Sequence, residues 1–375
     1  MSNFAFGTYK LNDINIQHIE ALKEAINGGI NLVVTSSNYT TSEQAIGSIF
    51  SQMDDSLLED VEIVSKYKLS QNLDEQLLKS LDNLGVSSID CYLVEGVEEI
   101  LANSIKEGVS RDDMLDEVYA KLFDAFLELE VAVKEGKINS YGVSSESFSQ
   151  PSNSKLFLPY EDLLTLAQDA SSEVRNEKHS FSTIELPVNI LETDGIKCSK
   201  WAKENSLRVL STRALSAYRD GKMYRLAEYD ESREYYHYLN ELLEICDNDL
   251  LEPLYNLIEQ LDDKKHLYSW IGEYEDFLIA EIIPHIKKSL EVLDDGEGLD
   301  TILRYIDIFL TEYRKMVSYE CGRKTKLELQ DEFEALKTTT LQKYALNFLL
   351  DIDTVDFIVV GMPKVSYIDE VLELV

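Results

Sequence analysis

Short β-branched runs alternate with longer helical patterns through the first 217 of the 375 residues, and this alternation constrains the fold more than any other feature. The eight candidate strands are residues 5–9, 31–35, 62–67, 90–94, 140–144, 182–186, 208–212 and, after a long interruption, 355–361. Strands that alternate with helices form parallel sheets with helical connections. Eight such units predict an α/β fold in which the sheet closes into a (β/α)8 barrel.

The segments between the candidate strands carry the pattern of amphipathic helices. Apolar residues recur three and four positions apart, as in Ile19, Leu22 and Ile26. Glycines such as Gly85 stand directly before the next strand, where helices commonly end. Each connection is therefore expected to place one helix on the outside of the barrel.

Residues 218–334 interrupt the pattern after the seventh strand and contain only long helical stretches, which predict a large all-helical insertion. Breaks at Asp262-Asp263 and at residues 294–298 predict three long helices. The expected domains are thus a barrel of residues 1–217 plus 335–375 and an acidic helical insertion of residues 218–334.

The insertion holds about twice as many acidic as basic residues and more than half of the tyrosines. Its aromatic residues can form the core of an appended helical bundle. Loops that follow barrel strands leave from the catalytic face, so the insertion can alternatively cover the pocket and select substrates. A surface that holds a protein partner is a further alternative.

The charge excludes several classes of function. The chain has 35 Lys+Arg against 70 Asp+Glu, a formal charge of -35, which would repel nucleic acids and anionic membranes. No apolar run approaches the roughly 18 residues of a membrane span, and the first residues do not resemble a signal peptide, so a cytoplasmic protein is expected. The four cysteines are far apart and none of the five histidines follows a strand, so we expect no disulfide framework and no metal site.

A series of motifs follows the predicted strands in order. They read FGTYKL, EAINGGINLVVTSSNYTTSEQAIG, EIVSKYKL, LLKSLDNLGVSSIDCYLVEG, LEVAVKEGKINSYGVSS, ELPVNILE, VLSTRALSA and DFIVVGMPKVSYIDEVL. Together they resemble the aldo-keto reductases, TIM-barrel oxidoreductases that transfer a hydride between NADPH and a carbonyl or alcohol. The resemblance covers residues 4–217 and 336–374.

The resemblance implies four catalytic groups at the ends of strands two to four: Asp, Tyr, Lys and His. Tyr39 and Lys66 match the proton-donating Tyr and the Lys that makes its phenol more acidic. Val34 stands where the family has its Asp, and Glu95 stands where it has its His. The tetrad of this divergent chain is therefore expected to be altered.

Without the Asp, the Lys66 ammonium would lack a counterion, which is costly inside a barrel. Two compensations by Glu95 are open. An ionised Glu95 could serve as the counterion of Lys66, or a protonated Glu95 could donate a hydrogen bond to the substrate carbonyl in place of the His. A third alternative is that Glu95 marks a site that has lost its activity.

Cofactor contacts carry over in part. Gly7 and Thr8 match the first-strand Gly-Thr beside the dinucleotide, and Ser144 matches the Ser that binds the nicotinamide carboxamide. The Asn that usually follows this Ser motif is replaced by Ser145 and Glu146. Glu185 takes the place of the carboxamide-binding Gln and can accept from an amide but not donate to it.

Two basic residues complete the cofactor set. Arg213 ends the seventh strand, where it could lie on the nicotinamide or the pyrophosphate or form a salt bridge at the rim. Lys364 follows the eighth strand, where the family pairs a cation with the 2′-phosphate of NADP. Asp369 and Glu370 are close to it in sequence, so NADP(H) is expected, with NAD(H) as the alternative.

The sequence therefore predicts an aldo-keto reductase-like enzyme that uses NADP(H) and a small carbonyl or alcohol substrate, with weakened activity as one expectation. The alternative is a non-catalytic barrel that binds nucleotide, or that binds a protein partner through residues 218–334.

Overall fold

The computed structural model describes residues 3–293 and 296–374. The chain divides into two compact units. One runs through Ala214 and resumes at Asn347, and the other is Leu215–Leu346. The second unit thus ends inside helix α14 (Leu341–Leu350), later in the chain than residue 334, where the sequence analysis placed the end of the insertion.

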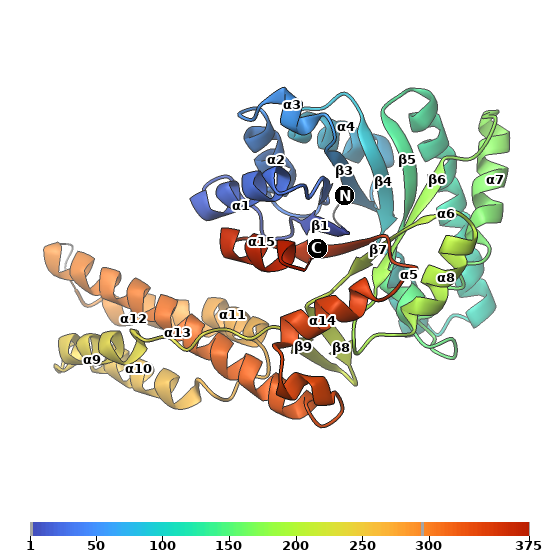
Figure 1. Cartoon of the computed structure of the whole chain (residues 1–375). Helices are drawn as coiled ribbons and strands as arrows, with labels where there is room; N and C mark the ends of the chain where they lie inside the picture. The colour runs from blue at the N-terminus through green and yellow to red at the C-terminus, as the bar shows by residue number, and fades with distance from the viewer. Residues whose placement is uncertain (1–2, 294–295, 375) are drawn as a thin grey trace. The chain divides into compact units, whose positions relative to one another are not determined.

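The first unit is a closed barrel of parallel strands in the order β1-β10-β7-β6-β5-β4-β3-β2, which confirms the predicted barrel (Figure 1). The barrel strands are β1 (Phe4–Gly7), β2 (Leu32–Val34), β3 (Glu62–Lys68), β4 (Ile89–Glu95), β5 (Ile138–Ser144), β6 (Phe181–Pro187), β7 (Arg208–Thr212) and β10 (Phe357–Gly361). Closure is made by β1 and β10, where Phe4 pairs with Ile358 and Gly7 with Gly361.

Helices surround the barrel strands (Figure 1). They are α1 (Ile16–Asn27), α2 (Ser42–Phe50), α3 (Asp55–Leu58), α4 (Leu73–Leu84), α5 (Val97–Glu107), α6 (Arg111–Lys134), α7 (Leu163–Val174), α8 (Gly195–Glu204) and α15 (Val365–Leu372), with a 3₁₀ turn η1 (Glu146–Ser149) after β5. The ends of α4 follow the sequence signals. Asn72 accepts a hydrogen bond from the Glu75 N–H, and Gly85 ends the helix in the left-handed conformation with φ 69°.

Apolar side chains from several strands fill the barrel. The buried cluster comprises Ala5, Leu32, Val34, Val64, Cys91, Leu93 and Leu210, with Phe357 and Val359 packed against it. Gly142 leaves no space for a side chain, because a Cβ there would stand 1.9 Å from the Thr183 carbonyl oxygen and 2.8 Å from Leu93. The register between β5 and β6 shifts at Tyr141/Gly142. Polar side chains are left to the carboxyl ends of the strands, where barrel enzymes place their sites.

The second unit is not all-helical, which corrects the sequence analysis. It begins with the antiparallel hairpin β8 (Ser216–Arg219) and β9 (Lys222–Arg225), in which Arg219 pairs with Lys222. The two turn residues, Asp220 and Gly221, have φ values of 54° and 80°. Two positive φ values suit the twist of a two-residue hairpin, and Asp-Gly favours such turns. This signal is visible in the sequence and was missed.

The helices of the second unit also differ from the predicted three. The structure contains α9 (Tyr235–Cys246), α10 (Glu252–Lys264), α11 (Ile271–Phe277), a π-helical turn η2 (Leu278–Ile282), α12 (Ile283–Leu290) and α13 (Glu297–Leu329), followed by a 3₁₀ turn η3 (Glu334–Lys337). Helix α10 continues through Asp262-Asp263, so that break was placed too early. Of the predicted break at residues 294–298, residues 294 and 295 lie outside the described residues.

Buried aromatic side chains form the core of the second unit. Tyr235 on α9 lies 6.1 Å, between ring centroids, from Phe309 on α13, and Tyr274 on α11 lies 5.3 Å from Tyr313. The aromatic residues of this segment therefore pack against one another. None of the helices in the described ranges is long and apolar enough to cross a membrane.

Candidate active site

The structure brings the two predicted catalytic residues together at the carboxyl end of the barrel. Lys66 lies near the end of β3 and is 4% exposed. Tyr39 lies in the loop after β2, which is held to β3 by a hydrogen bond from the Ser37 N–H to the Lys66 carbonyl oxygen. The Lys66 Nζ stands 5.6 Å from the centre of the Tyr39 ring.

The counterion of Lys66 is Glu185 on β6. The Lys66 Nζ lies 2.6 Å from the Glu185 Oε1, and the two side chains are 5% and 1% exposed. The Ser144 hydroxyl, from the paired position on β5, donates to the same oxygen at 2.7 Å. The other carboxylate oxygen, Oε2, is buried and has no hydrogen-bond partner. One side of this carboxylate is therefore satisfied, and the other is left as an acceptor.

The environment of this pair decides the charge of Lys66. Burial alone would lower the pKa of the Lys66 ammonium, but the negative charge of Glu185, with smaller effects from Tyr39 and Glu95, outweighs burial and raises that pKa above its ordinary value. The pKa of the Tyr39 phenol is raised by burial, while Lys66 acts in the opposite direction. At neutral pH the site thus holds a charged amine beside a neutral phenol.

Val34, which the sequence analysis placed at the position of the family's Asp, is buried among apolar side chains. It belongs to the buried cluster inside the barrel and pairs with Val64 on β3, two residues before Lys66. The sequence analysis did not predict Glu185 as the partner of Lys66. Glu185 is on β6, which lies on the opposite side of the barrel from β2. The signal that could have predicted this ion pair is the acidic residue at position 185 together with the apolar residue at position 34.

Glu95 does not take the counterion position that the sequence analysis offered it. Its Oε1 accepts hydrogen bonds from the Ser36 hydroxyl at 2.8 Å and from the Asn38 side-chain amide at 2.7 Å. The reason is its register, because Glu95 ends β4 opposite Lys68, two residues beyond Lys66. Ser36 and Asn38 were not predicted as its partners. Both are polar residues of the motif that contains Tyr39.

Gly7 and Thr8 are used by the barrel itself. A Cβ at Gly7 would stand 3.1 Å from a Val359 methyl group and 3.3 Å from the Val360 carbonyl oxygen. The Thr8 hydroxyl donates to the Val34 carbonyl oxygen at 3.1 Å. These contacts hold the end of β1 between its two neighbouring strands, and they account for both residue types without a ligand.

Arg213 is bound by two carboxylates. Its guanidinium forms ion pairs with Glu192 and, at 3.2 Å, with Glu146, and its Nε is buried without a hydrogen-bond partner. Its φ of 56° is unusual for a residue other than glycine. Asn189 donates to the Arg213 carbonyl oxygen at 3.3 Å, which helps to fix this turn. Arg213 thus links the segments that follow β5 and β6.

Lys364 is an exposed residue. It precedes the first residue of α15, and its Nζ lies 5.8 Å from the centre of the Tyr367 ring. Its position directly after β10 leaves the ammonium accessible to an anion in solution.

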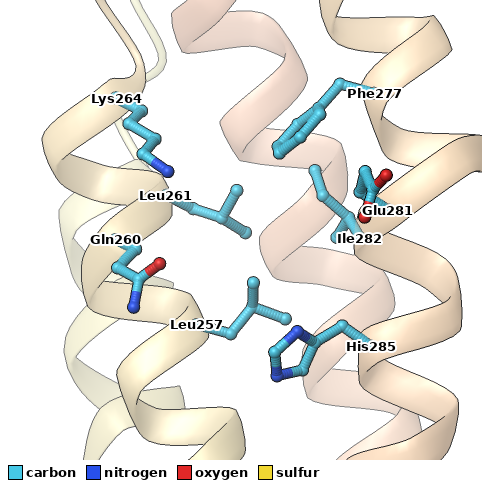
Figure 2. Close-up of a pocket in the computed structure, with 8 residues that line it drawn as sticks. All are labelled: Leu257, Gln260, Leu261, Lys264, Phe277, Glu281, Ile282 and His285. Atoms are coloured by element: carbon cyan, nitrogen blue, oxygen red, sulfur yellow. The ribbon is translucent and has the colours of Figure 1, made fainter.

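The second unit has a cavity of its own, of about 120 Å³, between α10 and the segment from α11 to α12 (Figure 2). Leu257 and Leu261 face Phe277 and Ile282 across it, as Figure 2 shows. The remaining lining residues are Gln260, Lys264, Glu281 and His285. None of the residues predicted for catalysis or cofactor binding lines this cavity.

The model of the aldo/keto reductase family matches residues 3–254, and no match was found among curated protein sequences. Residues 336–374, which the sequence analysis also compared with the family, lie outside this match.

Similar solved structures have low identity. An aldo/keto reductase from Klebsiella pneumoniae, crystallised with NADP and acetate, is 19% identical over 57% of this chain and 64% of its own, with a TM-score of 0.38. A putative aldo-keto reductase from Pseudomonas aeruginosa is 20% identical over 58% and 74%, also at 0.38. This chain thus matches less than two thirds of the Klebsiella protein.

The family match alone covers more than half of the chain, and it includes the loop that carries Tyr39 and the strands that carry Lys66 and Glu185. This chain belongs to the aldo/keto reductase family.

Proposed function

We propose that this protein is an NADP(H)-dependent oxidoreductase that reduces a carbonyl group to an alcohol, with Tyr39 as the proton donor. The observation that carries the proposal is the buried, ion-paired Lys66 ammonium beside the Tyr39 phenol. A cation next to a phenol stabilises the phenolate that proton donation leaves behind. A buried ion pair stabilises a fold little more than apolar side chains of similar volume do. Stability of the fold therefore does not explain why a buried amine lies here.

The chemistry assigned to the residues of the chain is a proton transfer. The Tyr39 phenol is neutral at physiological pH, as phenols ordinarily are, and burial raises its pKa further. It gives its proton to the carbonyl oxygen as that oxygen gains negative charge. The Lys66 ammonium favours the resulting phenolate. Glu185 in turn stabilises the ammonium, so the three groups act in series.

The residues at the strand ends fit a nicotinamide cofactor, which would supply the hydride. The buried Glu185 Oε2, which has no partner in the protein, can accept an N–H of the carboxamide. Ser144 would border the same group, and Gly7 and Thr8 would provide backbone beside the dinucleotide. We assign Lys364 to the 2′-phosphate, since its ammonium is exposed. Arg213 would reach a phosphate only by leaving its carboxylate partners.

Glu95 influences which carbonyl compounds are accepted. The two hydrogen bonds donated to its Oε1 suit an ionised carboxylate, which places a negative charge where the family has a His. Like charges disfavour one another at a binding site. We therefore propose neutral carbonyl compounds, rather than keto acids, as substrates.

The non-catalytic alternative has one observation in its favour. Arg213 is held by Glu192 and Glu146, so one of the two cations assigned to the cofactor is already neutralised within the protein. If nucleotide binding has been lost, the remaining function would be to bind a protein partner through the second unit. Measurement of cofactor binding therefore distinguishes the reductase function from the partner-binding function.

The direct test is titration of the protein with NADPH and with NADH, followed by quenching of intrinsic fluorescence. We expect the wild type to bind NADPH. The Lys364→Glu variant should bind NADPH at least about tenfold more weakly, because a charge-assisted contact to phosphate is lost. Lys79→Glu, an exposed lysine on α4, is the matched control for the change in net charge. Absence of binding by both nucleotides would exclude the reductase function.

A further inference from the structure

The charge arrangement at Lys66 is unusual for its position on the strand. Its counterion belongs to β6, and two strands, β5 and β4, separate β6 from β3 in the barrel. The adjacent strand β2 contributes Val34, whose side chain is part of the apolar cluster. The contact therefore crosses the barrel, whereas an ion pair could have been made locally.

We propose that Glu185 is the positioning residue of this site, which serves as the buried counterion of Lys66 in place of a carboxylate on β2. The proposal rests on the proposed function for its catalytic meaning, but the ion pair itself can be tested in the protein alone.

Three features of the contact support this role. The pair is short, at 2.6 Å, and both side chains are at least 95% buried, so the solvent cannot provide another counterion. Ser144 donates to the same oxygen, which fixes the orientation of the carboxylate. The second oxygen, Oε2, points to no protein donor and adds to the negative charge felt by Lys66.

The groups that face Lys66 come from three elements. Glu185 is on β6, Glu95 is at the end of β4, and Tyr39 is in the loop after β2. Glu95 accepts hydrogen bonds from Ser36 and Asn38, and its charge acts on Lys66 through space. Removal of the Glu185 charge would leave Lys66 buried with only this weaker partner, and a buried amine without a counterion loses its proton more easily.

A carboxylate placed on β2 should restore the positive charge of Lys66 in the absence of Glu185. Val34 pairs with Val64, two residues before Lys66 on the neighbouring strand, so a carboxylate at position 34 would be a diagonal neighbour of Lys66. Glu185→Gln removes the counterion of Lys66, and Val34→Asp/Glu185→Gln supplies a carboxylate from β2 instead. Comparison of the two variants therefore distinguishes loss of the negative charge from loss of the Glu185 side chain itself.

The experiment measures the titration of Lys66 in the cofactor-free protein by ¹³C NMR of lysine labelled at Cε, with the signal assigned by its loss in Lys66→Arg. We expect Lys66 to remain charged through about pH 10 in the wild type. In Glu185→Gln its titration should move down by at least about one pH unit, and Val34→Asp/Glu185→Gln should return it toward the wild-type range.

Glu43→Gln is the matched control. Glu43 is a buried carboxylate that accepts a hydrogen bond from Ser65, the residue before Lys66, and a second one from Asn83 on α4. Its loss changes a buried charge beside β3 but should leave the Lys66 titration in place. An equal shift in Glu43→Gln and Glu185→Gln would overturn the proposal, as would an unchanged titration in Glu185→Gln.

Activity provides the second measurement. In an active enzyme, Glu185→Gln should move the alkaline limb of kcat to lower pH, and the double variant should move it back. A shifted titration in a protein without reductase activity would reject the proposed function and support the ion pair. If Glu185→Gln does not fold, Val34→Asp/Glu185→Gln decides between the outcomes. A double variant that folds and keeps Lys66 charged supports the proposal. A double variant that does not fold, or in which Lys66 loses its proton at lower pH than in the wild type, overturns it.

Discussion

The Lys66 ammonium lies 5.6 Å from the centre of the Tyr39 ring while its charge is balanced by Glu185 on the other side. Tyr39 is thus next to a cation that is itself fixed by a second buried group. This arrangement keeps the amine charged beside a neutral phenol.

Loss of Lys66 should destabilise the fold far more than loss of an exposed lysine on the same strand. Lys66→Met leaves Glu185 buried without its partner, and removal of one member of a buried ion pair costs about 3–5 kcal/mol. Lys68→Met removes a pair with Glu99 of the same length, 2.6 Å, in which the side chains are 36% and 53% exposed, and should cost less than about 1 kcal/mol. Urea unfolding of both variants measures the difference. Equal losses would contradict the buried ion pair.

The contribution of the pair to stability should depend on pH only under alkaline conditions. The pKa of Lys66 is raised in the folded protein, so the stabilisation is complete below the unfolded value of about 10.4 and is lost as the pH passes through the folded value. The difference in unfolding free energy between wild type and Lys66→Met should therefore be the same at about pH 7 and pH 9 and decrease above about pH 10. A decrease already between the two lower values would show that Lys66 is not held charged.

Substitution of Gly142 should disrupt the barrel. The Cβ of Gly142→Ala would stand 1.9 Å from the Thr183 carbonyl oxygen, which is backbone and cannot move without a change in strand pairing. We expect a loss of about 3 kcal/mol or more, measured by thermal or urea unfolding. Gly298→Ala on α13 is the control, because nothing lies within 4 Å of the added Cβ and alanine favours a helix by about 1 kcal/mol. A small effect at Gly142 would contradict the strand register.

Removal of the Glu95 charge should change substrate preference more than it changes the fold. The side-chain oxygen of Glu95→Gln can still accept from Ser36 and Asn38, so stability should change by less than about 1 kcal/mol. For keto acids, KM should fall several-fold because like-charge repulsion is removed, whereas KM for neutral aldehydes should change little. A loss of turnover for neutral substrates as large as in Tyr39→Phe would instead assign Glu95 a direct part in proton transfer.

The barrel could be predicted from the sequence because its signals are local and repeated. Each strand is a short β-branched run, and each helix has its own apolar period and its own end, as at Gly85. The second unit was harder. Its helical pattern is compatible with several alternative breaks. The Asp220-Gly221 hairpin depends on two residues only.

The candidate site was predictable in its parts but not in its contacts. Tyr39 and Lys66 follow from motifs at the ends of adjacent strands. The Lys66–Glu185 pair joins residues 119 positions apart on strands that are not neighbours, and the sequence does not tell which of several inward-facing acids reaches the amine. The same holds for Glu95, whose partners depend on its register with Lys68.

Tyr39 is the proposed proton donor in an NADPH-dependent reduction. The most direct measurement is a single-turnover reaction of the NADPH complex with a panel of neutral aldehydes and ketones, followed by the loss of reduced-nicotinamide absorbance. The control is Tyr9→Phe, an exposed neighbour whose ring packs edge-on against Tyr39 at 5.2 Å. We expect Tyr39→Phe to bind NADPH as the wild type does but to reduce the substrate about 100- to 10,000-fold more slowly, while Tyr9→Phe stays within about tenfold of the wild type. Equal rates in the wild type and Tyr39→Phe, or no reduction by the wild type, would contradict proton donation by Tyr39.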